Sequence, residues 1–352
     1  MAEGSLLHVE GLETRFYTKR GEVHAVNGVS FQLARGERLA VVGESGSGKS
    51  ATALSLMGLL PSSGKVIAGR VLLNGRELLA LRREELRRIL GKEVAMVFQD
   101  PMTSLNPVMR LRHQLVPPMR EHLELDSGAA LQRAIELLRR VGIPDAAARV
   151  DAYPHELSGG MRQRALIAMA ISCGPDLIIA DEPTTALDVT IQAQIVALLK
   201  QLSDDTGTAV LFITHDFGLV ARFAHTIAVM YAGRIVEYGS ARDVFAHRYH
   251  PYTRALLRSI PTIAGPKPER LAQIEGAPPD AIALGPGCPF RPRCPVALPR
   301  CAEERPELLE RAPGHRAACW VETGSEFGVL GYQLAPAQNP EPLKGVERIA
   351  TS

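Results

Sequence analysis

The eight residues from 43 to 50, Gly-Glu-Ser-Gly-Ser-Gly-Lys-Ser, have the types and spacing that bind phosphate. They match G-x-x-x-x-G-K-[ST], a loop whose glycines let several backbone N–H groups turn towards one phosphate chain. Residues 37–42 predict a strand before the loop, and residues 50–60 predict a helix after it, whose N-terminal end adds positive potential. This context favours phosphate binding over a Gly/Ser-rich linker. We expect Lys49 to reach the β- and γ-phosphates and the Ser50 hydroxyl to ligate Mg²⁺.

An acidic pair follows a second apolar run. Residues 177–180 predict a buried strand that ends at Asp181 and Glu182. Asp181 is expected to hold Mg²⁺, directly or through water, and Glu182 is a candidate general base for the water that attacks the γ-phosphate. The alternative, a solvated acidic pair, is less compatible with a chain that already has a phosphate loop. His215 ends another apolar strand and would face the same crevice, although a lone histidine is more often structural.

A second anion-binding helix end is predicted at residues 158–161, Ser-Gly-Gly-Met. Ser158 suits the N-cap of a helix over 162–171, and the two glycines would expose backbone N–H groups there. Because one loop already cradles one nucleotide, a second such end suggests a site completed between two subunits. The same tripeptide also occurs in plain loops, so this signal alone is weak.

The elements that must position these groups alternate between strand and helix. Short continuous apolar runs suit strands buried on both faces of a mostly parallel sheet, and they lie at 94–98, 177–180 and 209–213. Residues 129–141 and 190–203 predict amphipathic helices, so the alternation favours a doubly wound α/β fold. Period-2 stretches within 6–35 predict a small antiparallel sheet beside the main one, and 226–238 predicts a hairpin around its central glycine.

Composition excludes several classes of protein. The 352 residues, 46% apolar and 22% charged, indicate an ordinary globular chain of about two domains, at roughly 150 residues each. A net charge of +2 gives no reason to expect bulk binding to nucleic acid or an anionic membrane. No apolar run approaches the roughly 18 residues of a membrane-spanning helix, and the first residues do not resemble a signal peptide.

Four of the five cysteines, Cys288, Cys294, Cys301 and Cys319, lie in a proline-rich stretch that begins near 255–262. Structural disulfides are rare inside cells, so a metal staple is the natural expectation. The cysteines lack the C-x₂₋₄-C spacing of zinc knuckles, and two Cys-Pro steps fit an iron–sulfur cluster at least as well. The residues alone leave iron–sulfur, zinc and unligated thiols open.

In this order the motifs resemble the ATP-binding cassette (ABC) family over about residues 6–250, and the Ser-Gly-Gly signature makes the resemblance specific. The resemblance implies an α/β P-loop NTPase core, a small antiparallel β subdomain, a helical subdomain at about 100–170, and a small irregular cysteine-containing C-terminal domain. It implies that Gln99 contacts Mg²⁺ and takes part in catalysis with Glu182 and His215, that Asp188 lies in the dimer-contacting D-loop, and that 158–161 contact the partner's ATP. The ATP contacts it implies are Phe16 at the adenine, with Tyr17 as the alternative, and Gly43, Glu44, Ser45, Gly46, Ser47, Gly48, Lys49, Ser50 and Ala51.

Longer segments resemble the ATPase subunits of oligopeptide and dipeptide importers; they are 98–107, 153–164, 250–253 and 287–294. Met161, where many cassettes have Gln, suggests the D-type subunit of a D/F heterodimer. This resemblance implies an ATPase with ATP, Mg²⁺ and a [4Fe–4S] cluster on the four cysteines, with Zn²⁺ as the alternative. The implied partners are an F-type ATPase, two permeases and an extracytoplasmic binding protein, at the cytoplasmic face of a bacterial inner membrane.

The expected domain bounds are 1–258 for the cassette, 259–325 for the cysteine-containing domain and 326–352 for an irregular tail. An importer for nickel, glutathione or an oligosaccharide is the alternative. A soluble ABC ATPase that acts on nucleic acid fits less well, because the chain has a single cassette and almost no net charge.

Overall fold

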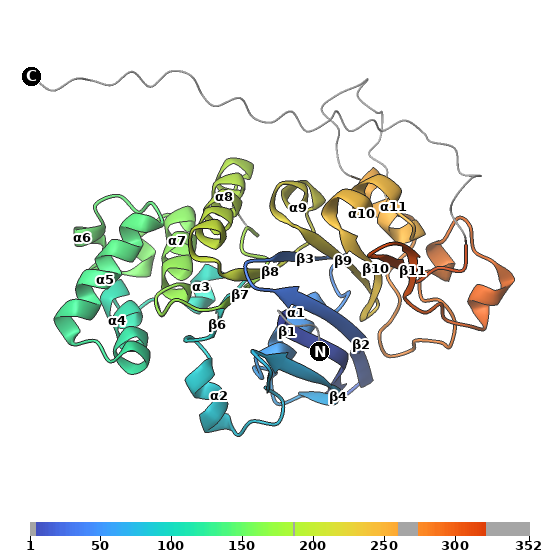
Figure 1. The fold of residues 1–352 in the computed structure, drawn as a ribbon, viewed down its shortest axis with the longest axis horizontal. Coiled ribbons are helices and arrows are strands. Elements are labelled where there is room, and N and C mark those ends of the chain that lie inside the picture. Colours follow the sequence, from blue (N-terminus) through green and yellow to red (C-terminus); the bar gives the residue numbers. More distant parts are fainter. Residues whose placement is uncertain (1–4, 186, 260–273, 322–352) are drawn as a thin grey trace, which may run out of the picture. The chain divides into compact units, whose positions relative to one another are not determined.

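The computed structural model describes residues 5–185, 187–259 and 274–321, and the part up to Trp320 forms one compact unit. The expected tail at 326–352 lies outside the described residues. An eight-stranded sheet has the order β11-β12-β10-β9-β3-β8-β7-β6 (Figure 1). Its strands are β3 (Arg38–Val42), β6 (Val94–Val97), β7 (Leu177–Asp181), β8 (Ala209–Thr214), β9 (Thr226–Tyr231), β10 (Arg234–Ser240), β11 (Leu309–Ala312) and β12 (His315–Ala317).

Neighbouring strands pair in parallel in the part of the sheet with the order β9-β3-β8-β7-β6, and both faces of this part are buried. In β7, Ile178 packs with the helical core on one face, while Ile179 packs with the N-terminal sheet on the other. This two-sided burial explains the continuous apolar runs in the sequence, and it confirms the predicted α/β fold. The helices that follow the strands are α1 (Lys49–Leu56), α8 (Val189–Thr206), α9 (Phe217–Phe223), α10 (Ala241–His247) and α11 (Pro251–Arg258).

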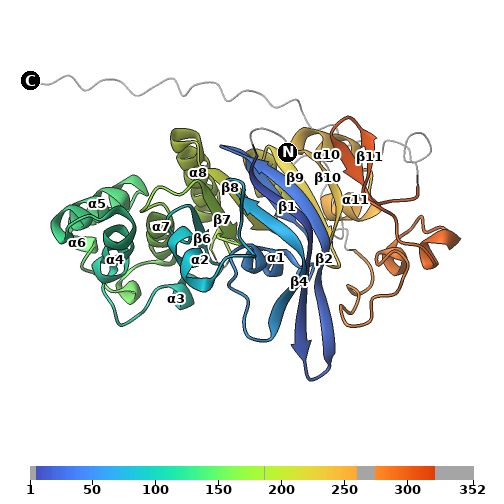
Figure 2. The same ribbon diagram turned by 60° about the horizontal axis from the view of Figure 1, so that its bottom comes forward.

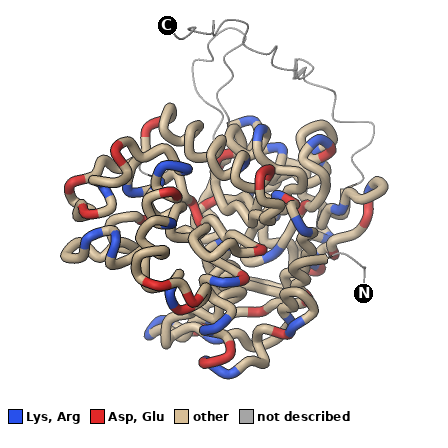
Figure 3. The backbone as a smooth tube through the Cα atoms, turned by 60° about the vertical axis from the view of Figure 1, so that its left-hand side comes forward, with Lys and Arg blue, Asp and Glu red and all other residues tan. Residues whose placement is uncertain are grey.

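The predicted antiparallel sheet is present as β2-β1-β4-β5 (Figure 2). Its strands are β1 (Ser5–Thr18), β2 (Gly21–Ala34), β4 (Gly64–Leu73) and β5 (Arg76–Glu77). Between β5 and β7 the chain is mainly helical, with α2 (Arg83–Ile89), α3 (Pro101–Ser104), α4 (Leu111–Leu123), α5 (Ser127–Arg140), α6 (Ala146–Arg149) and α7 (Gly159–Ala170). No helix in the described ranges is long and apolar enough to cross a membrane. Basic and acidic residues are interspersed along the backbone (Figure 3), which agrees with the small net charge.

The C-terminal region is more regular than we expected. Two 3₁₀ turns, at Arg291–Arg293 and Pro299–Ala302, precede the β11–β12 hairpin. Strand β12 pairs with β10, so this hairpin extends the main sheet. The sequence did not predict it because each strand is only three or four residues long, too short for a period-2 pattern.

A buried polar cluster joins this hairpin to α11. The Glu237 carboxylate accepts the backbone N–H groups of Tyr249 and His250, at 2.7 and 3.0 Å, and lies 2.8 Å from His315 Nε2. His250 Nδ1 accepts the Tyr252 N–H at 3.1 Å, which caps the start of α11. Burial lowers the pKa of His250 to about 4, although the Glu237 charge opposes this shift.

This His250 environment predicts a pH dependence of stability. Between pH 6.5 and about 4 the unfolded chain binds a proton at this position that the folded chain excludes, so acid favours unfolding. We expect wild type to lose about 2 kcal/mol more unfolding free energy than His250→Asn between pH 7.5 and 5, because Asn keeps an N-cap acceptor but does not titrate. Urea unfolding at both pH values measures the difference. Equal losses in both proteins would contradict the assignment.

Candidate nucleotide site

The phosphate loop lies between β3 and α1 and is held by its own lysine. Lys49 Nζ donates to the carbonyls of Gly43 and Glu44, at 2.8 and 2.9 Å, and the side chain is only 4% exposed. The ammonium also lies 4.0 Å from Glu182 Oε1. Burial lowers the pKa of Lys49, while Glu182, Asp181 and Glu44 oppose that shift. These contacts therefore hold the Lys49 ammonium group inside the phosphate loop.

Two carboxylates end β7 opposite this cation. Ser50 Oγ donates to Asp181 Oδ1 at 3.0 Å, so two of the three predicted Mg²⁺ ligands are already adjacent. Burial raises the pKa of the Asp181 carboxyl, and the Ser50 hydrogen bond opposes this shift. The backbone of Glu182 is left-handed, with φ of +45°. Residues other than glycine rarely adopt this conformation, and those that do are often found at functional sites.

Besides Lys49, three side chains converge on the Glu182 carboxylate. Gln99 Nε2 and Thr185 Oγ1 donate to its Oε2 at 3.1 and 3.0 Å, and His215 Nδ1 lies 3.4 Å from Oε1. The contact with His215 lowers the pKa of Glu182 and raises the pKa of His215. The carboxylate is thus ionised at neutral pH, which a general base requires.

A cavity of about 1080 Å³ unites these groups. The predicted residues that line it are Phe16, Gly43, Glu44, Ser45, Gly46, Gly48, Lys49, Ser50, Ala51, Gln99, Glu182 and His215. Ser47 is buried instead of lining the cavity, and its hydroxyl has no partner among the described residues. Asp181 reaches the cavity edge through Ser50. The fold therefore brings predicted residues from five separate stretches of sequence to one cavity.

The signature residues lie outside this cavity. Ser158 N-caps α7, and its Oγ accepts the Met161 N–H at 3.3 Å. A Cβ on Gly160 would lie 3.0 Å from Ile191 of α8, so a small residue suits the contact. Asp188 N-caps α8 by accepting the Ile191 N–H at 3.0 Å. Ala186 of the D-loop motif is not among the described residues.

The cysteines gather near one another without forming an evident metal site. The Cys288 N–H donates to the Cys301 carbonyl at 2.9 Å. Burial raises the pKa of Cys288 to about 11, and Cys301, Cys319 and Cys294 add to the shift. In the described part of the chain, however, no three His, Cys, Asp or Glu side chains are arranged to hold a metal ion, and no disulfide is formed. The expected four-cysteine ligand set is therefore not seen as a formed cluster site.

Sequence reasoning missed Thr185, which supports Glu182, and several residues that line the nucleotide cavity. Thr185 could have been noticed, because it lies three residues after Glu182 in the same loop. The cavity is also lined by Leu256 and Ser259 at the end of α11, and by Ile274, Pro278 and Ala281 of the C-terminal region. These residue types carry no motif, so only the fold places them here.

Comparison with known proteins agrees with this geometry. The family described as ABC transporter matches residues 26–185, and the oligopeptide/dipeptide transporter C-terminal region matches 236–301. A probable peptide ABC transporter ATP-binding protein, y4tR of Sinorhizobium fredii, is 51% identical over 90% of this chain and 94% of its own length. This chain belongs to the ATP-binding subunits of peptide ABC transporters. Like other members of that family, it is an ABC ATPase, which hydrolyses ATP to drive transport.

Other relatives of this ABC subunit agree. The oligopeptide transport ATP-binding protein OppD of Escherichia coli is 48% identical over 90% of this chain and 93% of its own length. The dimeric post-hydrolysis structure of the ATP-binding cassette MJ0796, bound to ADP and Pi, has a TM-score of 0.61 and 26% identity. The structural match covers 67% of this chain and 99% of the MJ0796 chain. Neither these names nor the geometry above supports the predicted iron–sulfur cluster.

Proposed function

We propose that this subunit powers the import of oligopeptides or dipeptides by closing with a second ABC ATPase over two ATP molecules. One observation carries the proposal: the cavity gathers the phosphate loop, Gln99, Glu182 and His215, while residues 158–161 lie outside it on a separate helix end. A single chain thus supplies two complementary halves of a nucleotide site, and only a dimer joins them. The dimeric form of MJ0796 and the names of the peptide-transport relatives support this proposal.

The donor set fits ATP with Mg²⁺. A hydroxyl (Ser50), a carboxylate (Asp181) and an amide (Gln99) offer the oxygen ligands that Mg²⁺ prefers. The buried Asp181, whose pKa is raised, would gain a counter-charge from the cation. When bound, Mg²⁺ would neutralise phosphate charge during transfer.

The chain's own residues have separable roles in hydrolysis. Lys49 supplies a buried positive charge to the phosphates, and Phe16 is the proposed adenine contact. Glu182 accepts a proton from the attacking water, while Gln99, Thr185 and His215 orient its carboxylate. The helix end at Ser158 of one subunit would complete the partner's site, so turnover is coupled to closure.

Large apolar side chains are exposed around Gln99 and the start of the helical region. They are Phe98, Met102, Val108 and Met109. Exposed large apolar side chains suit a docking surface, and we propose that the two permeases bind in this part of the chain. The second ATPase would be of the F type, as Met161 suggests, and a binding protein would deliver peptide outside. The complex would then lie at the cytoplasmic face of a bacterial inner membrane.

The test is uptake by the complete complex in liposomes with ATP inside. Wild type should import labelled dipeptide or oligopeptide, whereas Ser158→Arg should bind ATP normally as a single subunit but lose uptake and most complex ATPase activity. Ser158 lies outside its own chain's cavity, which is why binding should survive. Nickel uptake without peptide uptake would show that the cargo is nickel and not peptide. Normal transport by Ser158→Arg would contradict the proposal that two subunits share each ATP site.

For the four cysteines we propose a [4Fe–4S] cluster with a structural or regulatory role, and Zn²⁺ is the alternative. The support is the resemblance of 287–294 and the closeness of two of the cysteines in the chain's fold, where the Cys288 N–H donates to the Cys301 carbonyl. Because the described geometry is not a formed ligand set, no step of hydrolysis is assigned to it.

We expect anaerobically purified protein to be brown, with about four irons per chain, and Cys288→Ser to lose colour and iron together. Absorption spectra with iron and zinc assays measure this, and Cys173→Ser is the matched control outside the cluster region. A colourless wild type with one zinc would favour the alternative. A protein that contains neither iron nor zinc would exclude both the iron–sulfur cluster and the zinc site.

A further inference from the structure

The nucleotide cavity has a wall that comes from the C-terminal region. Ile274, Pro278 and Ala281 line the same cavity as Lys49 and Phe16. The Ala281 carbonyl accepts the His24 N–H of β2 at 2.9 Å, and a Cβ on Gly21 would lie 3.2 Å from the Ile282 side chain. We call residues 274–282 the C-terminal wall. Its end, at Ala281 and Ile282, packs against the β1–β2 hairpin, which also carries Phe16.

A buried ion pair connects the same region to the phosphate loop. Arg293 Nη1 and Nη2 donate to the two carboxylate oxygens of Glu44, at 2.6 and 2.9 Å. The Arg293 side chain is 3% exposed and that of Glu44 is 26% exposed. Two parallel, charge-assisted hydrogen bonds fix both distance and orientation. Glu44 is the second residue of the phosphate loop, and its backbone N–H also donates to Tyr252 Oη at 2.8 Å.

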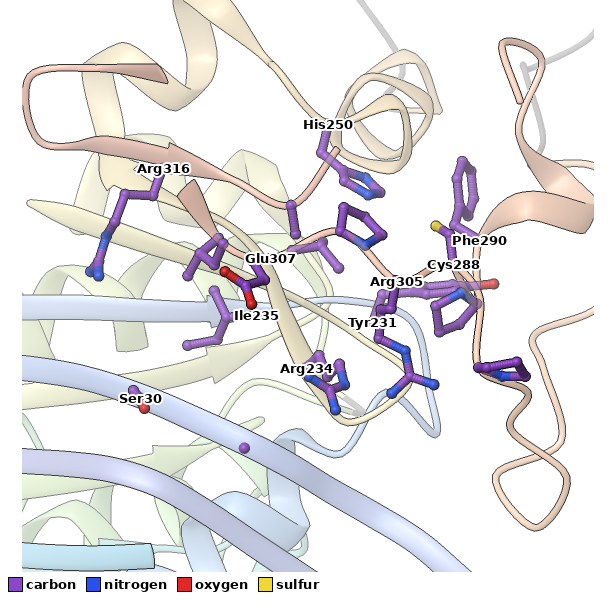
Figure 4. Close-up of a pocket in the computed structure, with 17 residues that line it drawn as sticks. Ser30, Tyr231, Arg234, Ile235, His250, Cys288, Phe290, Arg305, Glu307 and Arg316 are labelled. Atoms are coloured by element: carbon purple, nitrogen blue, oxygen red, sulfur yellow. The ribbon is translucent and has the colours of Figure 1, made fainter. Parts of the chain in front are cut away.

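The same guanidinium also holds the C-terminal wall. Arg293 Nε donates to the Glu275 carbonyl at 3.1 Å, and Nη2 donates to the Ile274 carbonyl at 3.3 Å. The Arg293 carbon Cζ lies 5.9 and 6.0 Å from the ring centres of Tyr231 and Phe290. Figure 4 shows Tyr231 and Phe290 with Cys288 among the residues that line a neighbouring pocket, and the two ring centres are 5.3 Å apart. One buried side chain thus touches the loop and the wall together.

We propose that Arg293 is a positioning residue for nucleotide binding, which fixes Glu44 of the phosphate loop and holds residues 274–282 as a second wall of the nucleotide cavity. The inference rests on the proposed ATP site and adds a C-terminal part to it. Because coupling between two sites is reciprocal, bound nucleotide must stabilise the C-terminal wall as much as the wall stabilises bound nucleotide. Loss of Arg293 would free Glu44 and release the carbonyls of Ile274 and Glu275 at once.

The experiment compares Arg293→Gln with Arg305→Gln in the full-length chain. Arg305 also donates to C-terminal carbonyls, those of Gly285 and Gly287, and neither of these hydrogen bonds involves the phosphate loop. Arg293→Gln should weaken ATP and ADP binding by about tenfold and raise KM in the complete complex, with kcat within about twofold of wild type. ATP should slow hydrogen exchange at 274–282 in wild type and in Arg305→Gln, but not in Arg293→Gln.

A double-mutant cycle separates positioning from loss of stability. Glu44→Gln and Arg293→Gln should be strongly non-additive in ATP affinity, and Arg293→Lys, which keeps the charge without the bidentate geometry, should be intermediate. Unchanged affinity in a folded Arg293→Gln protein, or an equal loss in Arg305→Gln, would overturn the inference while leaving the ATP site intact. If wild type itself binds no ATP, the proposed function fails first.

Discussion

Replacing Glu182 by Gln is expected to leave ATP binding nearly unchanged while turnover in the complete complex falls by on the order of 10²- to 10⁴-fold. Glutamine can keep the contacts with Gln99 and Thr185 after its amide rotates, but it cannot accept a proton from water. Because the pKa of Glu182 is lowered, the wild-type carboxylate is ionised throughout the neutral range. Nucleotide titration and steady-state phosphate release measure the two effects separately.

Thr185→Val is the matched control for this substitution. It removes one hydrogen bond, of 3.0 Å, to the same carboxylate but leaves the base in place. We expect its turnover to fall by only about fivefold, in keeping with the loss of a single hydrogen bond of about 1 kcal/mol. If Glu182→Gln hydrolysed ATP at the normal rate, another group would have to be the base, and His215 would be the next to test because it lines the same cavity.

The sheet and most of the ATP cavity could be predicted from sequence because local patterns determine them. A strand such as β7 is covered on both faces, so its positions must be apolar until it ends at Asp181, a buried carboxylate that accepts the Ser50 hydroxyl at the nucleotide site. The phosphate loop needs glycines and a lysine at fixed spacing, since its geometry is made by consecutive residues. Both signals lie within short windows of the chain.

The C-terminal contribution could not be predicted, because its signals are spread over the whole chain. Arg293 and Glu44 are separated by 249 positions, and both are residue types that usually lie on the surface. The wall residues Ile274, Pro278 and Ala281 have ordinary side chains in a proline-rich stretch. Strand β12 is too short to show a pattern, yet it joins this stretch to the main sheet. Long-range pairing of ordinary residues leaves no trace that a single sequence can reveal.

Gly48→Ala is expected to remove nucleotide binding by displacing the start of α1. Gly48 N-caps this helix with φ of +102°, a conformation that side chains rarely adopt. A Cβ there would lie 2.3 Å from the Ala25 carbonyl oxygen and 2.9 Å from Met230 Cε, so the backbone must move. Lys49 and Ser50 follow directly and would move with it. A shift of about 1 Å in such positioning groups costs on the order of 10²-fold in function.

Gly207→Ala separates this collision from backbone strain alone. Gly207 also has a left-handed backbone, with φ of +68°, but no atom lies within 4 Å of its added Cβ, and it ends α8 away from the loop. We expect it to lower the unfolding free energy by about 1 kcal/mol without changing ATP affinity. Urea unfolding and ATP titration of both variants measure the two effects. If Gly48→Ala bound ATP as tightly as Gly207→Ala does, the loop would tolerate movement of α1, and the close approach to Ala25 would not be what holds Lys49 at the phosphates.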